Sequence, residues 1–296
     1  MTSPQAITQT AVPTAETEEL APPAGRERLA GLAADLRAGK LVPYLGPDLL
    51  PDTTSVPRTP EALALALHAR VAVSSRIRGN LWTTAQSIES RRHRTTLTAL
   101  MAEIFRAAVP PTALHRALAA LPLPLIVDTW YDGAMRAALV ESGRTDWGEI
   151  QGITRAHQTD GNWSRTYDAT GAEVDPAVAA GWTTVLYKPH GGVVPAQNFL
   201  VSDSDYVEVL TEIDIQTPIP PAVKERRSGR GFLFVGTRFH DQMLRIFAGQ
   251  IAKRSGSGHA ALVDSVMLTR NEARFLTTLG ADPVAATADE FAALLG

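Results

Sequence analysis

A short buried strand that runs into a tight turn constrains the fold of this chain more than any other feature. Residues Leu41 to Leu45 form an apolar run, and Gly46 closes it. A helical pattern from Arg26 to Lys40 precedes this run, with leucines on one face and Gly39 near its end. In α/β proteins, the turn after such a strand commonly holds a nucleotide phosphate. We therefore expect an α/β domain with a ligand site at this turn.

Three further apolar runs end in polar or glycine-containing turns. They are Leu123 to Val127, Trp182 to Tyr187 and Gly231 to Val235, and helical patterns lie between them. This alternation predicts a doubly wound, Rossmann-like parallel sheet whose strands end at a common crevice. Residues 144–180 interrupt the alternation with several turn signals, so we expect a small inserted subdomain there, with Trp163 to Thr170 as one arm of a β-hairpin.

Composition along the chain predicts where the folded domain begins and where a long loop lies. Residues 1–24 are rich in Thr, Pro, Ala and Glu and have no apolar period, which predicts a disordered tail. Residues 25–296 form the predicted α/β domain. We expect a helix over Ser202 to Ile213, and a loop over Gln216 to Arg230 because that segment contains prolines and a basic cluster.

Composition excludes several classes of protein. The chain has 296 residues, with 45% apolar and 20% charged residues, which is ordinary for a globular protein. Its net charge of -3 gives no reason to expect a nucleic-acid partner. No apolar stretch reaches the roughly 18 residues needed to cross a membrane. The N-terminus lacks the basic and apolar regions of a signal peptide, so we expect a cytoplasmic protein.

The absence of cysteine excludes further chemistry. With no cysteine, the chain has no disulfide, no thiol nucleophile and no thiolate zinc site. We expect no metal site.

Five short blocks resemble, in order, those of the SIR2-like family, the wider group around sirtuins. The family's first strand ends in Gly-Ala-Gly-x-Ser, and its later blocks are Thr-x-Asn-x-Asp, His-Gly, Ser-x-x-Asp-Tyr and a strand followed by a glycine loop. The corresponding segments here begin at Gly46, Asp128, His190, Ser202 and Phe232. Deacylating sirtuins carry a four-cysteine zinc module that this chain cannot build. The resemblance is therefore to the zinc-free branch, some members of which hydrolyse NAD.

The resemblance implies an NAD site with one catalytic residue. His190 corresponds to the general base that acts on the nicotinamide ribose, a role that suits a group with a pKa near neutrality. The implied cofactor-binding residues are Gly46, Trp130, Asp132, Gly191, Gly236 and Thr237.

The chain departs from the family pattern where the cofactor should bind. Pro47 removes a backbone donor, and Asp48 adds a negative charge where a pyrophosphate should lie. Trp130 replaces the Asn that positions the ribose and the attacking water, and packing is its favoured role. Asp132 is read first as a helix cap. For His190, a general base and a polar residue held by a local hydrogen bond are equally supported.

Three functions follow from these observations. The favoured hypothesis is a divergent pseudoenzyme that binds NAD, a related adenine nucleotide or a protein partner, with weak or no turnover. The alternative is an active NAD glycohydrolase or ADP-ribosyl-transferring enzyme that uses His190. The third hypothesis is a plain Rossmann-like scaffold whose interaction surface is the segment from Arg144 to Ala180. A zinc-dependent deacylase is excluded by the lack of cysteine.

Overall fold

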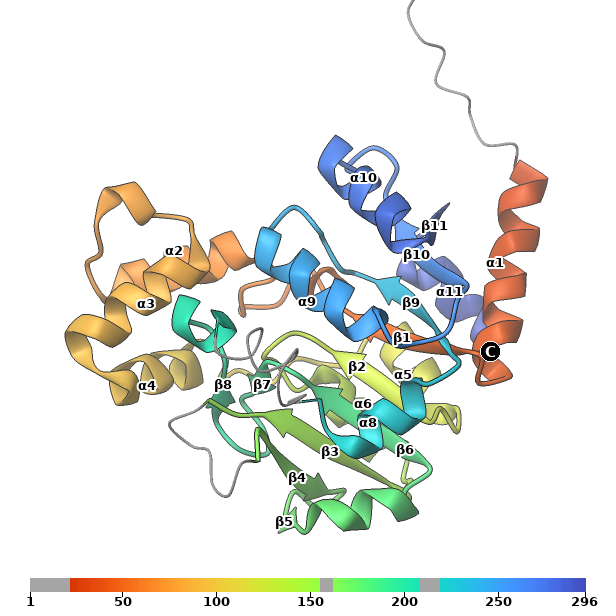
Figure 1. The fold of residues 1–296 in the computed structure, drawn as a ribbon, viewed down its shortest axis with the longest axis horizontal. Helices are drawn as coiled ribbons and strands as arrows, with labels where there is room; N and C mark the ends of the chain where they lie inside the picture. Colours follow the sequence, from red (N-terminus) through yellow and green to blue (C-terminus); the bar gives the residue numbers. More distant parts are fainter. Residues whose placement is uncertain (1–21, 155–161, 208–218) are drawn as a thin grey trace, which may run out of the picture.

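A large, mostly parallel sheet runs through the middle of the protein (Figure 1). The structure, a computed structural model, describes residues 22–154, 162–207 and 219–296. The strands of the main sheet are β1 (Leu41–Leu45), β2 (Leu125–Asp128), β3 (Trp147–Gly152), β4 (Ser164–Asp168), β5 (Glu173–Val174), β6 (Thr184–Lys188), β9 (Gly231–Val235), β10 (His259–Val263) and β11 (Ala281–Ala285). Their order within the described residues is β11-β10-β9-β1-β2-β6-β3-β4-β5.

The order of the strands places a crevice beside β1. From β11 to β3 all neighbouring strands are parallel, and β9 pairs with β1 along its whole length, from Leu41↔Gly231 to Leu45↔Val235. The strands that follow β1 in the chain, β2, β3 and β6, lie on one side of it, and the later strands β9, β10 and β11 lie on the other side. The direction of strand addition therefore reverses at β1. Such a reversal leaves a crevice at the carboxyl ends of the two central strands. The predicted doubly wound, Rossmann-like sheet is confirmed.

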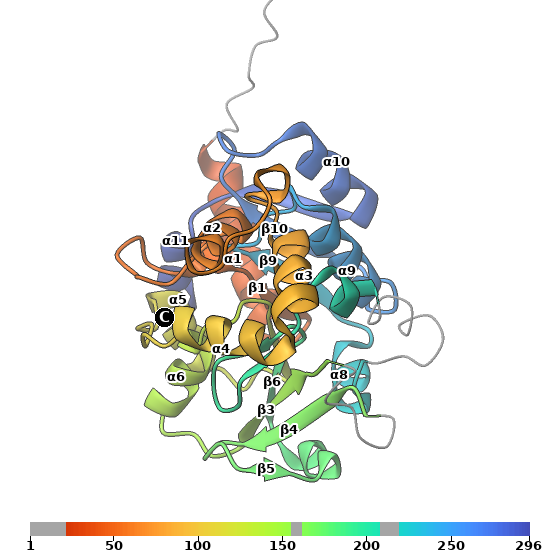
Figure 2. The same ribbon diagram turned by 90° about the vertical axis from the view of Figure 1, so that its left-hand side faces the viewer.

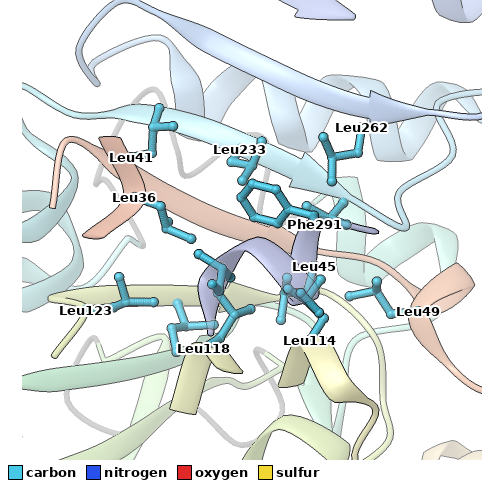
Figure 3. Packing of buried hydrophobic residues seen from close by; sticks show 14 of the residues in the cluster. Leu36, Leu41, Leu45, Leu49, Leu114, Leu118, Leu123, Leu233, Leu262 and Phe291 are labelled. Atoms are coloured by element: carbon cyan, nitrogen blue, oxygen red, sulfur yellow. The ribbon is translucent and has the colours of Figure 1, made fainter. Parts of the chain in front are cut away.

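Helices cover both faces of the sheet and its carboxyl end. The helices are α1 (Pro22–Arg37), α2 (Pro60–Arg70), α3 (Leu81–Arg92), α4 (Arg94–Ile104), α5 (Ala113–Ala120), α6 (Ala134–Glu141), α8 (Pro221–Arg227), α9 (Gln242–Ala252), α10 (Arg270–Leu279) and α11 (Ala288–Leu295). Helices α1, α5, α6 and α11 bury a leucine-rich cluster against one face (Figure 3). Helices α8, α9 and α10 cover the other face.

A third layer is formed by α2, α3 and α4, which lie together at one end of the sheet (Figures 1 and 2). Their apolar residues form one cluster with Leu50, which follows β1, and with Trp130 and Tyr131, which follow β2. Burial of apolar surface, at about 25 cal/mol per Å², therefore ties this helical layer to the strand ends where the crevice lies.

The described residues of segment 144–180 continue the main sheet. Strand β3 pairs in parallel with β6, from Trp147↔Thr184 to Gln151↔Lys188. Strand β4 pairs antiparallel with both β3 and β5, so the predicted hairpin arm is present. The segment thus lengthens one edge of the sheet. The division into a tail at 1–24 and one domain at 25–296 with an insertion at about 144–180 stays a prediction.

The predicted loop over Gln216 to Arg230 is wrong for residues 221–227, which form α8. Pro221 stands in the first turn of this helix, where its missing N–H costs nothing. The basic residues that suggested a loop lie in the last turn, where they favour the negative end of the helix dipole. Of the helix predicted at Ser202 to Ile213, residues 203–207 are helical, and 208–213 lie outside the described residues.

Two small strands, β7 (Gly191–Gly192) and β8 (Asn198–Phe199), form a separate antiparallel pair after β6. Gly191 has φ +73°, and a Cβ added to it would lie 2.0 Å from the carbonyl oxygen of Asn198. The glycine of the His-Gly block is therefore required by its positive φ and by the close approach of the Asn198 backbone.

Candidate functional site

The turn after β1 uses its own backbone donors. The Gly46 N–H donates to the Val235 carbonyl at 3.0 Å. The Asp48 N–H donates to the Gly236 carbonyl, also at 3.0 Å. The proline between them has no N–H to offer. In a glycine-rich phosphate loop these groups would point at the phosphate, so this turn lacks the donors that a pyrophosphate needs.

Two glycines bring the turn after β1 against the turn after β9. A Cβ added to Gly46 would lie 2.4 Å from the Gly236 carbonyl oxygen and 2.6 Å from the Thr237 Cα. Gly236 has φ +65°, and a Cβ added there would lie 2.6 Å from the Leu49 side chain. Both predicted binding glycines are therefore required by the packing of the two turns.

The substitution Gly46→Ala is expected to lower the free energy of unfolding by about 1–3 kcal/mol. The nearest atoms to the new methyl group are backbone atoms, so one turn must shift. Urea unfolding measures the change. Gly249→Ala, in helix α9 with no atom within 4 Å of the added Cβ, is the control and should be neutral or stabilising. Equal stability of Gly46→Ala and the unmodified protein would contradict the close approach.

A cavity of about 420 Å³ lies at the carboxyl ends of β1, β9 and β10. This volume falls within the roughly 300–1,000 Å³ of small-molecule pockets. Gly236 and Thr237 line the cavity from β9, and Asp264 lines it from β10. The Oγ1 atom of Thr237 is buried and has no hydrogen-bond partner among the described residues. This buried hydroxyl lies beside Gly46, and its lack of a partner calls for an explanation such as a water or a ligand.

A second cavity, of about 20 Å³, lies against Trp130 and Tyr44. It has room for about one water molecule. The Trp130 Nε1–H donates to the Pro57 carbonyl at 2.8 Å, and its ring packs 5.1 Å from the Tyr131 ring. Trp130 is thus a buried wall residue that is held by ring packing and one hydrogen bond.

His190 is buried and lines neither of the two cavities. Its Nδ1 lies 2.9 Å from the Thr129 carbonyl oxygen, which only accepts, so Nδ1 carries the proton. Nε2 is then an unprotonated nitrogen, and it has no partner among the described residues. The ring packs on Phe247 and Tyr206. Burial lowers the pKa of His190 to about 4, so the imidazole is neutral.

Asp132 belongs to a buried ionic cluster and lines neither cavity. The Lys188 Nζ lies 2.6 Å from the Asp128 Oδ2, and it also donates to the Asp132 carbonyl at 2.9 Å. The Asp132 Oδ1 accepts the N–H of Ala134 at 2.8 Å, at the start of α6. Burial, and next the charge of Asp128, raise the pKa of Asp132 to about 6. Asp132 thus closes an Asx turn that leads into α6, and the predicted helix-cap role is wrong, because the N-cap of α6 is Gly133.

The predicted site residues therefore divide into two groups. Gly236, Thr237 and Trp130 line the cavities, and Gly46 adjoins the first two of these. His190, Gly191 and Asp132 line neither cavity. Their roles in binding or catalysis stay predictions.

Two arginines that line the cavities were not predicted from the sequence. Arg58 comes from the loop before α2, and Arg238 follows β9, and both line both cavities. Each stands alone in a loop, and the two approach only because β9 pairs with β1. The sequence gives one sign that an arginine lines the site: Arg238 stands two residues after Gly236, which ends a predicted strand.

Neither a metal site nor a membrane span is found in the parts of the chain that the structure describes. No three His, Cys, Asp or Glu side chains within residues 22–154, 162–207 and 219–296 are grouped to hold a metal ion. Over the same residues, no helix combines the length and apolarity that crossing a membrane requires.

Comparison with known families places the chain among SIR2-like domains. A family model described as SIR2-like domain matches residues 124–284, which is more than half of the 296 residues. Among curated proteins, none matches the chain. The matched region begins just before β2 and ends within β11, so it includes the turn after β9 and the His-Gly block.

Proposed function

Since the chain belongs to the family of SIR2-like domains, we propose that it binds NAD or a related adenine nucleotide and turns NAD over weakly or not at all. The cavity of about 420 Å³ beside β1 and β9 carries this proposal. It lies at the reversal point of a doubly wound sheet, where such folds bind nucleotides. It is also lined by Gly236 and by Thr237, whose buried hydroxyl has no partner among the described residues.

The two halves of NAD fit the residues present unequally. The adenosine half finds a cavity of suitable size, with the Thr237 hydroxyl and the Asp264 carboxylate in its wall. The nicotinamide half would need the second cavity, which has about 20 Å³ beside the fixed ring of Trp130. His190 lies outside both. Binding without efficient cleavage is the function that this geometry supports best.

One observation favours the alternative, an NAD glycohydrolase or ADP-ribosyl-transferring enzyme. His190 is neutral, and its Nε2 is unprotonated and without a partner among the described residues. A general base needs such a nitrogen within about 2.6–3.2 Å of the hydroxyl that it deprotonates. Cleavage would therefore require His190 to come within reach of a cavity that it does not line.

Titration calorimetry of the full chain with NAD and with ADP tests the proposed binding. Thr237→Val keeps the shape of the side chain and removes the unpaired hydroxyl, so we expect it to leave the melting temperature unchanged or slightly raised. It should weaken nucleotide binding by about tenfold, the effect of one lost hydrogen bond. Undetectable binding of both nucleotides to the unmodified protein would refute the proposal.

A further inference from the structure

The two cavities meet at four residues, which line both of them: Asp48, Arg58, Thr237 and Arg238. These residues come from the turn after β1, the loop before α2 and the turn after β9. The junction thus places two guanidinium groups and one carboxylate beside the crevice. No backbone donor of the β1 turn is spare there, because those at Gly46 and Asp48 are used internally.

Arg238 is held in place by groups on one side of its guanidinium. Its Nε donates to the Glu272 Oε1 at 2.9 Å, and its Nη2 donates to the Glu272 Oε2 at 3.2 Å and to the Met267 carbonyl at 3.0 Å. The Glu272 carboxylate is itself fixed at the start of α10, where it accepts the N–H of Thr269. These contacts orient the guanidinium and leave the Nη1 donors outside them.

Arg58 is held more loosely. Its Nη1 donates to the Leu50 carbonyl at 2.7 Å and also contacts the carboxylate of Asp52. The Asp52 side chain is 88% exposed. An ion pair with so exposed a partner contributes little and exchanges readily. The Arg58 guanidinium can therefore accept another anion at small cost.

Asp48 is a further carboxylate at the junction, beside the ion-pair partners Glu272 of Arg238 and Asp52 of Arg58. Its side chain makes no ion pair within 4.0 Å among the described residues, yet it lies within electrostatic reach of Arg58, Arg238 and His240. Burial raises the pKa of Asp48, and the positive charges of these neighbours oppose that rise. Asp48 therefore adds a negative charge at the junction that neither arginine neutralises by an ion pair in the described residues.

We propose that the junction binds the terminal phosphate of an adenine nucleotide, such as ADP, between Arg58 and Arg238, in competition with the carboxylate of Asp48. This inference rests on the proposed function, because the adenosine part occupies the cavity of about 420 Å³. Arginine side chains then replace the missing backbone donors of a glycine-rich loop. A terminal phosphate carries up to two charges and three acceptor oxygens, so it pairs with two guanidinium groups better than one carboxylate does.

Calorimetry with ADP, adenosine and inorganic phosphate tests the inference on the full chain. Asp48→Asn removes the competing charge and is expected to tighten ADP binding by about tenfold while leaving adenosine binding unchanged. Arg58→Gln is expected to weaken ADP binding by about 10- to 100-fold, again without effect on adenosine. Inorganic phosphate should compete with ADP and not with adenosine.

Glu141→Gln serves as the matched control for Asp48→Asn, because it removes one negative charge from an exposed pair between Glu141 on α6 and Arg116 on α5. It should leave the affinity for ADP unchanged. The inference is overturned if ADP and adenosine bind equally well, or if Asp48→Asn and Arg58→Gln affect ADP no more than this control. Those results would leave standing the proposed binding of a nucleotide in the cavity of about 420 Å³. Absence of binding by ADP, adenosine and NAD alike would instead refute the proposed function.

Discussion

Replacing Lys188 by methionine is expected to lower the free energy of unfolding by about 3–5 kcal/mol, the largest effect of any substitution considered. The Lys188 side chain is 1% exposed, and its Nζ lies 2.6 Å from the Asp128 carboxylate. Burial alone would lower the pKa of Lys188, but Asp128, Asp132 and Glu149 outweigh it and raise that pKa. Methionine keeps the length of the side chain and leaves these carboxylates without their cation.

The loss should be smaller at about pH 5 than at about pH 8. The folded-state pKa of Asp132 is about 6, above the unfolded value of about 3.9. The folded protein therefore binds a proton on Asp132 more tightly than the unfolded chain does. The contribution of this group to stability falls as the pH rises from about 3.9 to about 6. Once Lys188 is gone, protonation of the carboxyl relieves part of the unpaired charge at low pH.

Urea unfolding at both pH values measures this effect. Lys40→Met is the matched control, because the Lys40 side chain is 70% exposed and pairs with Asp35 at the surface. We expect that control to change stability by no more than about 0.5 kcal/mol. Equal losses in the two variants would contradict the buried cluster at the carboxyl ends of β2 and β6.

The second large effect concerns the rate of NAD cleavage. Cleavage at the nicotinamide bond needs the pyrophosphate and the attacking water to be held while charge develops on the ribose. The β1 turn has used its N–H groups at Gly46 and Asp48. By the resemblance to the SIR2-like blocks, Trp130 takes the position of the Asn that should orient the water. Loss of one positioned polar group costs about 10²–10³ in rate, so two losses predict nicotinamide release on the order of 10⁴-fold or more below that of an intact site.

The strands around the crevice could be predicted from the sequence because their signal is local. The strand predicted at Gly231 to Val235 has the observed limits of β9, and each central strand ends at a glycine or a polar residue. The apolar runs at β1 and β9 are buried along their whole length, so hydrophobicity alone marks them. The crevice followed from the parallel order of these strands.

Strand β3 was missed because its signal is not local. Glu149 and Gln151 interrupt its apolar pattern, yet both are fully buried. Glu149 pairs with Arg136 at 2.9 Å, and the Gln151 side chain accepts from Asn198 at 3.0 Å. Their partners come from α6 and β8, so the cost of burying these polar groups is offset by contacts that no short stretch of sequence reveals.

The candidate site shows the same limit. The glycines and Thr237 could be placed because the strand ends mark them. The burial of His190 beside Phe247, and the approach of Arg58 to Arg238, depend on packing between elements that are distant in sequence. Sequence patterns therefore indicated where the cavity lies better than they indicated which side chains line it.

Incubating the purified chain with NAD, while recording both the heat of binding and the release of nicotinamide, tests the central claim most directly. We expect a measurable heat of binding together with nicotinamide release no faster than that from NAD in buffer. His190→Ala should leave that release unchanged, because His190 lines neither cavity. Release at an ordinary enzymatic rate that His190→Ala abolishes would contradict the claim and establish the glycohydrolase.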